Sequence, residues 1–178
     1  MKRLLLLTAV TLVCGCSSSL KVYSDRDKSI DISDYRYYYW PTEAAIERKG
    51  LNPLFYNELT DKRIKTAVND QLQRRGYIAN DEKRQIEMHY HIILEDKTLM
   101  ALEPSGAIYG KYWQNKSSTV YPYQEGTLII DLMDVQTKNL VWRGWATGVV
   151  ESDMTTNPEE AIGKAVAKIF KKFPYNFR

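Results

Sequence analysis

The sequence predicts an α+β fold, in which a four-stranded, mainly antiparallel sheet carries two helices on one face. Three segments in the second half of the chain alternate apolar and polar residues, which is typical of half-buried strands. Two other segments repeat apolar residues at helical spacing. Arranged along the chain, these elements follow the order β-α-β-β-β-α. The 178 residues suit one such domain, which we expect over residues 32–178, after a signal peptide at 1–15 and a flexible tether at 16–31.

The domain is expected to open with an aromatic-rich strand over residues 35–40, which ends at Pro41. A helix is predicted over residues 59–75, because Ile64, Val68 and Leu72 recur on one helical face. Gly76 then favours the end of this helix, since a residue with positive φ is wanted there.

The next three strands come from the alternating segments. Residues 85–95 alternate so that His89 and His91 share the face opposite Met88 and Tyr90.

Residues 127–135 and 140–150 are predicted to form a hairpin across a four-residue turn. Gly144, Ala146 and Gly148 fall on one face of the last strand, where small side chains let a helix approach closely.

The last helix has the clearest start. Asn157 can cap it, Pro158 suits its first turn, and Pro174 ends it. Its apolar stripe consists of Ile162, Ala165, Val166, Ile169, Phe170 and Phe173. Two amphipathic helices can cover only one face of the predicted sheet, so the other face is left to solvent or to a partner.

The N-terminus has a charged start, ten apolar residues and a small-residue exit, which together are typical of a secretory signal. Ten residues rise about 15 Å in a helix, roughly half of a bilayer core, so a permanent spanning helix is not expected. Val13, Cys14, Gly15 and Cys16 resemble the lipobox of bacterial lipoproteins. This resemblance implies that Cys16 becomes the acylated N-terminus, and Ser17 implies sorting to the outer membrane. The alternative is a cleaved, secreted protein in which this cysteine occurs by chance.

Composition excludes several classes of function. Removal of Lys2 and Arg3 with the signal lowers the formal net charge from +3 to +1, and we expect no nucleic-acid partner, because no concentrated basic patch remains. Cys14 leaves with the signal and Cys16 carries lipid, so the mature fold has no thiol for a disulfide or a metal. The sequence contains no nucleophile elbow, phosphate loop or dinucleotide-binding turn. We therefore expect no cofactor and no enzymatic activity.

A metal site is the main chemical alternative. His89 and His91 are the only two histidines, and a His-x-His pair can hold zinc when a third ligand arrives. Glu95 or Asp131 would supply that ligand, although two polar residues on a solvated sheet face are the simpler interpretation. Asp131 is also expected to pair with Arg143 across the hairpin.

Aromatic residues indicate a contact surface. Residues 104–125 are expected to form a polar connection that is unusually rich in rings, namely Tyr109, Tyr112, Trp113, Tyr121 and Tyr123. Tyrosine and tryptophan are favoured at interfaces, although the rings can equally pack into a satellite core. Trp145, together with Tyr35, Tyr37 and Tyr39, would extend this surface if they lie on the uncovered face.

Four stretches carry a family resemblance: Asn52-Pro53-Leu54, Arg75-Gly76-Tyr77, Glu-Gly-Thr-Leu-Ile-Ile-Asp at 125–131 and Leu-Val-Trp-Arg-Gly-Trp at 140–145. They resemble the domain-of-unknown-function family 4136 of bacterial envelope lipoproteins, over roughly residues 32–174. The resemblance implies a lipobox, a small α+β domain and no established activity.

These observations together predict a non-enzymatic lipoprotein of the outer membrane that is held by lipid on Cys16 and faces the periplasm. We expect it to bind an envelope protein, a glycan or a lipid component. A metal-dependent envelope hydrolase built on His89 and His91 and a purely structural spacer are the competing hypotheses.

Overall fold

The computed structural model describes residues 20–41, 57–102, 118–149 and 156–174, with the backbone alone over 97–102, over 118–124 and at 149. Its strands build one six-stranded sheet, in the order β1-β6-β5-β4-β2-β3. The strands are β1 (Lys21–Arg26), β2 (Tyr37–Tyr39), β3 (Ile78–Ala79), β4 (Ile86–Leu102), β5 (Ser118–Asp134) and β6 (Leu140–Val149). The helices are a short 3-10 helix (Ile32–Asp34), α1 (Glu58–Gln73) and α3 (Pro158–Phe170).

The α+β class is confirmed, but the four-stranded sheet is wrong. The strands β1, β6, β5 and β4 pair with one another in that order and antiparallel, whereas β2 runs parallel to both β3 and β4. The sheet is therefore mixed. The two additional strands, β1 and β3, were missed because one is polar and the other has only two residues.

The tether predicted over residues 16–31 is wrong for Lys21–Arg26, which form the edge strand β1 and pair with β6 at all six positions. An edge strand tolerates charged residues, because one of its sides faces solvent. Leu20 also belongs to the fold, since it packs against the core. A Cβ added at Gly148 would lie 2.7 Å from Cδ2 of Leu20. Three serines therefore separate Cys16 from the folded domain.

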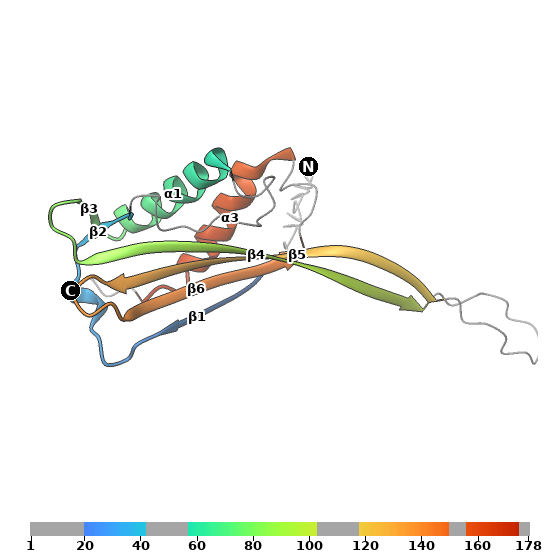
Figure 1. Cartoon of the computed structure of the whole chain (residues 1–178), viewed down its shortest axis with the longest axis horizontal. Helices are drawn as coiled ribbons and strands as arrows, with labels where there is room; N and C mark the ends of the chain where they lie inside the picture. Colours follow the sequence, from blue (N-terminus) through green and yellow to red (C-terminus); the bar gives the residue numbers. More distant parts are fainter. Residues whose placement is uncertain (1–19, 42–56, 103–117, 150–155, 175–178) are drawn as a thin grey trace, which may run out of the picture.

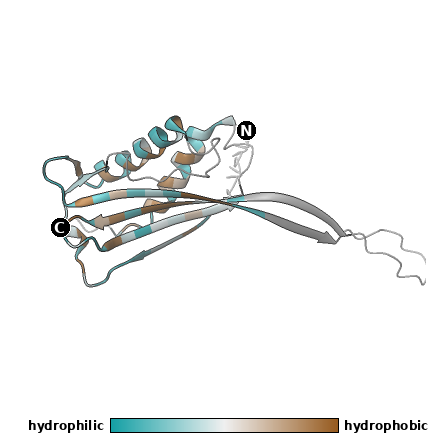
Figure 2. Cartoon of the chain, in the orientation of Figure 1, coloured by the Kyte–Doolittle hydropathy of each residue, from teal (hydrophilic) through white to brown (hydrophobic). Residues whose placement is uncertain are grey.

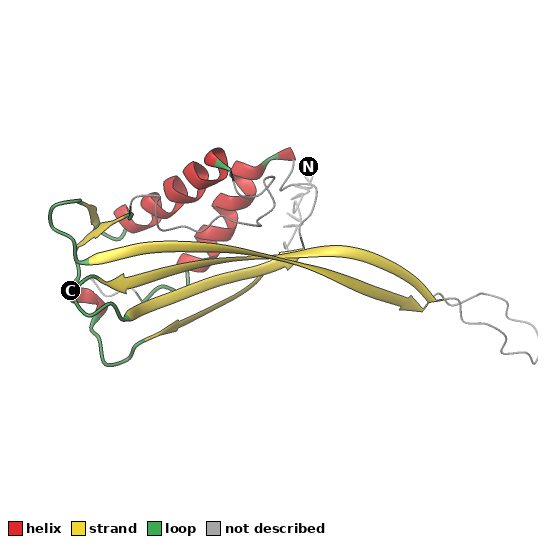
Figure 3. Ribbon diagram, viewed as in Figure 1, coloured by secondary structure: helices red, strands yellow, loops and turns green. Residues whose placement is uncertain are grey.

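Both helices lie on the same side of the sheet, as the sequence predicted (Figures 1 and 3). Hydrophobic and hydrophilic positions alternate along each helix in the manner of an amphipathic helix (Figure 2). The core lies between this layer and the sheet. Its largest fully buried side chains are Trp142, Tyr38, Phe170, Ile64, Leu72, Ile86, Met88, Ile130, Leu132 and Ile169.

The helix ends follow the local signals. Asn57 caps α1 by accepting a hydrogen bond from the backbone N–H of Thr60, and Gly76 adopts a φ of 76° just beyond the helix. Asn157 caps α3 in the same way, with Pro158 at its first position. The α3 helix ends at Phe170, but the predicted contact of Phe173 with the core is confirmed, since this side chain is buried.

The strands β4 and β5 pair along their whole length, from Ile86 with Asp134 to Leu102 with Ser118. The strand β6 accompanies them only as far as Glu125, which pairs with Val149. Residues 96–102 and 118–124 therefore form a two-stranded extension, which we call the ribbon and which projects beyond the sheet (Figure 1).

The prediction that residues 104–125 form a connection is wrong for residues 118–125, which belong to β5. Pro122 argues against a central strand, because proline cannot donate to the ladder. In the ribbon, however, β5 has a partner strand on one side only among the described residues, so the missing N–H is tolerated.

Two glycines test the packing of α3 against the sheet. A Cβ at Gly144 would lie 2.6 Å from Cγ2 of Ile169, whereas a Cβ at Gly163 would meet nothing within 4 Å. We expect Gly144→Ala to lower the free energy of unfolding by about 1–3 kcal/mol through overpacking. Gly163→Ala should raise it by up to about 1 kcal/mol, because alanine favours a helix over glycine. Urea unfolding of both variants measures the difference, and equal midpoints would contradict this packing.

Candidate binding surface on the open sheet face

The face of the sheet opposite the helices, which we call the open face, is built by alternate residues of four neighbouring strands. Ile130 and Leu132 of β5 and Met88 of β4 are buried on the helix side, so their neighbours in sequence point the other way. The residues placed on the open face are His89, His91, Ile93, Thr127, Ile129, Asp131, Arg143, Trp145, Thr147, Lys21, Tyr23 and Asp25.

An aromatic pair lies at one edge of this face. Tyr23 of β1 and Trp145 of β6 are register partners, and their rings stack with centroids 5.6 Å apart and planes 25° apart. Tyr23 remains 50% exposed and Ile93 44% exposed. Ile129 is the register partner of Trp145 on β5 and is partly exposed. Tyr23, Trp145 and Ile129 therefore form an apolar strip across β1, β6 and β5, and Ile93 lies on the same face of β4.

A charged row lies beside the apolar strip. The carboxylate of Asp131 is almost fully buried and accepts two hydrogen bonds from Arg143, from Nε and Nη2, each at 2.6 Å. The predicted Asp131–Arg143 pair is thus confirmed, and this hydrogen bonding raises the pKa of Arg143. Nε2 of His91 lies 3.7 Å from Oδ2 of Asp131. The pair fixes the guanidinium plane next to the aromatic rings.

A second polar cluster surrounds Glu87 at the other side of the face. Its carboxylate accepts a hydrogen bond from Nζ of Lys138 at 3.0 Å and lies 3.1 Å from Nε2 of His89. Burial by itself would raise the pKa of Glu87. The hydrogen bonds from Lys138 and Tyr39 and the nearby positive charges outweigh burial and hold the pKa below its usual value.

The histidine pair does not assemble a metal site from the described residues. His89 and His91 lie on the open face as predicted, but the carboxylate beside each is also engaged by a cation, Lys138 for Glu87 and Arg143 for Asp131. Within the described ranges, no group of three histidine, cysteine or acidic side chains is placed to hold a metal ion. A metal site would therefore need a ligand from another part of the chain.

The predicted aromatic surface is only partly within the described residues. Tyr109, Tyr112 and Trp113 lie outside them. Tyr121 and Tyr123 belong to the ribbon, in register with Leu99 and Lys97.

Trp145 lies on the open face, and so do Tyr37 and Tyr39, which flank the buried Tyr38. Tyr35 does not lie there, because its ring packs against the core and its hydroxyl donates to Asp134 at 2.8 Å. Burial and this carboxylate raise the pKa of Tyr35 to about 12. Tyr23 was missed because its segment was assigned to the tether, although Val22 and Tyr23 begin a short alternating pattern.

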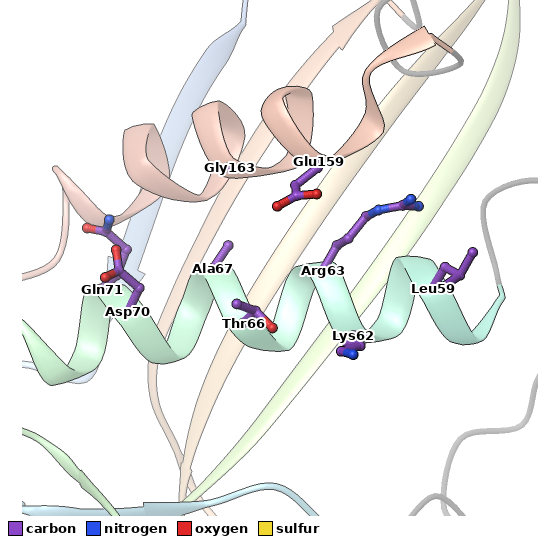
Figure 4. A pocket seen from close by; sticks show the side chains of 9 residues that line it. All are labelled: Leu59, Lys62, Arg63, Thr66, Ala67, Asp70, Gln71, Glu159 and Gly163. Carbon is purple, nitrogen blue, oxygen red and sulfur yellow. The ribbon is translucent and has the colours of Figure 1, made fainter.

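The helix side carries a shallow groove of about 570 Å³ between α1 and α3 (Figure 4). Leu59 and Arg63 of α1 and Glu159 and Gly163 of α3 line it. Its side chains carry both signs of charge and no convergent polar set, so it defines no particular ligand chemistry.

The fold and the open face define a class of small α+β proteins in which one helical layer covers one face of a mixed sheet. The chain belongs to the family described as "Domain of unknown function (DUF4136)", whose profile matches residues 22–175. The match begins inside β1, which agrees with a domain that includes this strand.

Solved structures show the same fold. A DUF4136 family protein from Bacteroides thetaiotaomicron is 18% identical, with a TM-score of 0.55 over 89% of this chain and 98% of that one. A PDZ domain protein from Parabacteroides distasonis is 11% identical, with a TM-score of 0.54 over 89% of this chain. The present chain spans only 37% of the length of that protein.

No curated protein matches the sequence. None of the helices in the described part of the chain is long and apolar enough to cross a membrane.

Substitution of Arg143 should lower the free energy of unfolding more than substitution of its partner Asp131. Arg143→Met leaves a carboxylate whose side chain is only 4% exposed without its main donor, which should lower the free energy of unfolding by about 2 kcal/mol. Asp131→Asn should cost less, about 1 kcal/mol, because the amide oxygen still accepts one hydrogen bond from Arg143 and the side chain of Arg143, which is 43% exposed, can turn its other N–H groups to water. Chemical denaturation of both variants measures the order, and the reverse order would contradict it.

Proposed function

We propose that this protein is an outer-membrane lipoprotein that acts without catalysis as a protein-binding module of the cell envelope. In this proposal the signal peptide is removed, Cys16 is acylated and the domain faces the periplasm. The observation that carries the binding role is the Tyr23–Trp145 stack, which lies exposed beside the Arg143–Asp131 pair on the open face.

The composition of the open face supports a protein partner. Tryptophan, tyrosine and arginine dominate the energetics of protein interfaces, and all three types meet here on two neighbouring strands. Asp131 holds the guanidinium of Arg143 in a fixed plane, so less side-chain freedom is lost when a partner binds. A sheet face presents side chains in flat rows, which suits a protein surface better than a small molecule that needs a concave site.

The N-terminal sequence supports the anchor. The motif Val13-Cys14-Gly15-Cys16 follows a short apolar segment, and acyl chains contribute about 0.8 kcal/mol per buried methylene, so two or more chains hold a domain stably at a membrane. Ser17 favours the outer membrane over the inner membrane.

The binding role predicts that the double substitution Tyr23→Ala and Trp145→Ala removes partners while the fold is kept. Crosslinking in intact cells followed by purification should recover fewer partner proteins than the unchanged protein does. Leu59→Ala is the matched control, because Leu59 is 63% exposed on α1, in the helical layer. If the folded double variant keeps every partner, the open face is not the binding surface.

The anchor predicts a mature protein that begins at Cys16 and carries acyl mass there. Mass spectrometry of the N-terminal peptide measures this directly. The substitution Cys16→Ser should abolish the acyl mass and release the protein from the membrane fraction. An unmodified thiol at Cys16 in the mature protein would contradict the anchor.

A further inference from the structure

The folded domain begins very close to the proposed anchor. Leu20 packs against the core and fills the space beside Gly148, and β1 begins at the next residue. Four peptide units join Cys16 to Leu20, and a fully extended chain of this length spans at most about 14 Å. If Cys16 carries lipid, as the proposed function requires, Leu20 lies within about 14 Å of the headgroup layer.

Leu20 lies at the end of the sheet from which the ribbon projects. Lys21 pairs with Thr147, and Val149, two residues further along β6, pairs with Glu125 at the base of the ribbon. The seven residue pairs beyond this base extend about 24 Å at 3.4 Å per residue. The ribbon is therefore longer than the segment that ties the domain to the anchor, and it projects from the end of the sheet at which β1 begins (Figure 1).

This geometry excludes an orientation in which the ribbon points away from the membrane. From Leu20, which lies opposite Gly148, the sheet runs in the other direction along β6 for eight residues, as far as Leu140, or about 27 Å. With a tether of about 14 Å, a domain turned that way would push the far end of the sheet into the hydrocarbon core. That end carries Lys138 and Glu87, and burying such charges in lipid is strongly unfavourable. The ribbon must therefore lie along the membrane surface or point into it.

The sequence of the ribbon fits such a position. The two charged residues of the ribbon, Asp96 and Lys97, lie at its base next to the sheet. Residues 98–102 (Thr-Leu-Met-Ala-Leu) and 118–124 (Ser-Thr-Val-Tyr-Pro-Tyr-Gln) carry no charge, whereas 26% of the residues in the whole chain are charged. Tyrosines such as Tyr121 and Tyr123 are typical of the membrane interface. No third strand among the described residues pairs with these segments, so their outer backbone groups need water or headgroups. This requirement holds the ribbon above the hydrocarbon core.

We infer that the ribbon is a second membrane contact, which lies in the lipid headgroup layer and, together with the lipid on Cys16, fixes the direction of the strands relative to the membrane. This inference rests on the acylation of Cys16 in the proposed function.

The test uses the full-length, acylated protein in phosphatidylcholine–phosphatidylethanolamine vesicles that carry a spin label on the lipid headgroup. A cysteine is introduced in the ribbon by Ser118→Cys, or by Thr98→Cys on the opposite strand, and is labelled with an environment-sensitive fluorophore. Acylation occupies Cys16 and Cys14 leaves with the signal, so the introduced thiol is the only free one. Gln136→Cys, in the exposed turn at the far end of the sheet, is the matched control.

The headgroup spin label should quench the fluorophore in the ribbon and leave the fluorophore at residue 136 unquenched. Equal, weak quenching at both positions, with acyl mass found on Cys16 of the same preparation, would overturn the ribbon contact and leave the anchor intact. A ribbon fluorophore that is shielded from water but not quenched by lipid would also overturn it, in favour of contact with a protein. A bare Cys16 would overturn the proposed anchor and this inference with it.

Discussion

The close packing of α3 on β6 is the contact that places the helices on one face of the sheet and leaves the other face uncovered by them. Gly144 has no side chain, and Ile169 of α3 therefore reaches the sheet. Beside it, the ring of Trp142 packs against Phe170 and Phe173. Arg75 at the end of α1 donates to the carbonyl of Phe170 at 2.8 Å, which joins the ends of the two helices. Both helices are thereby committed to one face, and the opposite face must be stable in contact with water or a partner.

The elements with strong local signals could be predicted from the sequence, and the elements defined by distant pairing could not. The caps at Asn57 and Asn157 and the positive φ at Gly76 depend on neighbouring residues alone. The strand β1 depends instead on hydrogen bonds to β6, more than a hundred residues away, and its own residues are mostly polar. The same reason applies to the ribbon, where pairing between β4 and β5 overrides the signal of Pro122.

For the candidate site, the sequence predicts the face of the strand on which a residue lies but not the residue that lies opposite it. Alternation placed Asp131, Arg143 and Trp145 on strands that the structure brings together. Alternation carries no information on register between distant strands, so the stacking of Tyr23 on Trp145 could not be foreseen. Register also explains the surroundings of the histidines, because it places His89 opposite Asp131 and the side chain of His89 next to that of Glu87. Both carboxylates are bound by cations, which makes this face an ion-paired surface.

The central claim is that a partner covers the open face in the cell, and hydroxyl-radical footprinting tests it most directly. Oxidation of Tyr23 and Trp145 would be compared between intact outer membranes and the purified protein, with the exposed Leu59 on α1 as internal reference. The account predicts that both aromatic residues are protected in membranes while Leu59 is oxidised equally in the two samples. Equal oxidation of Tyr23 and Trp145 in both samples would contradict it.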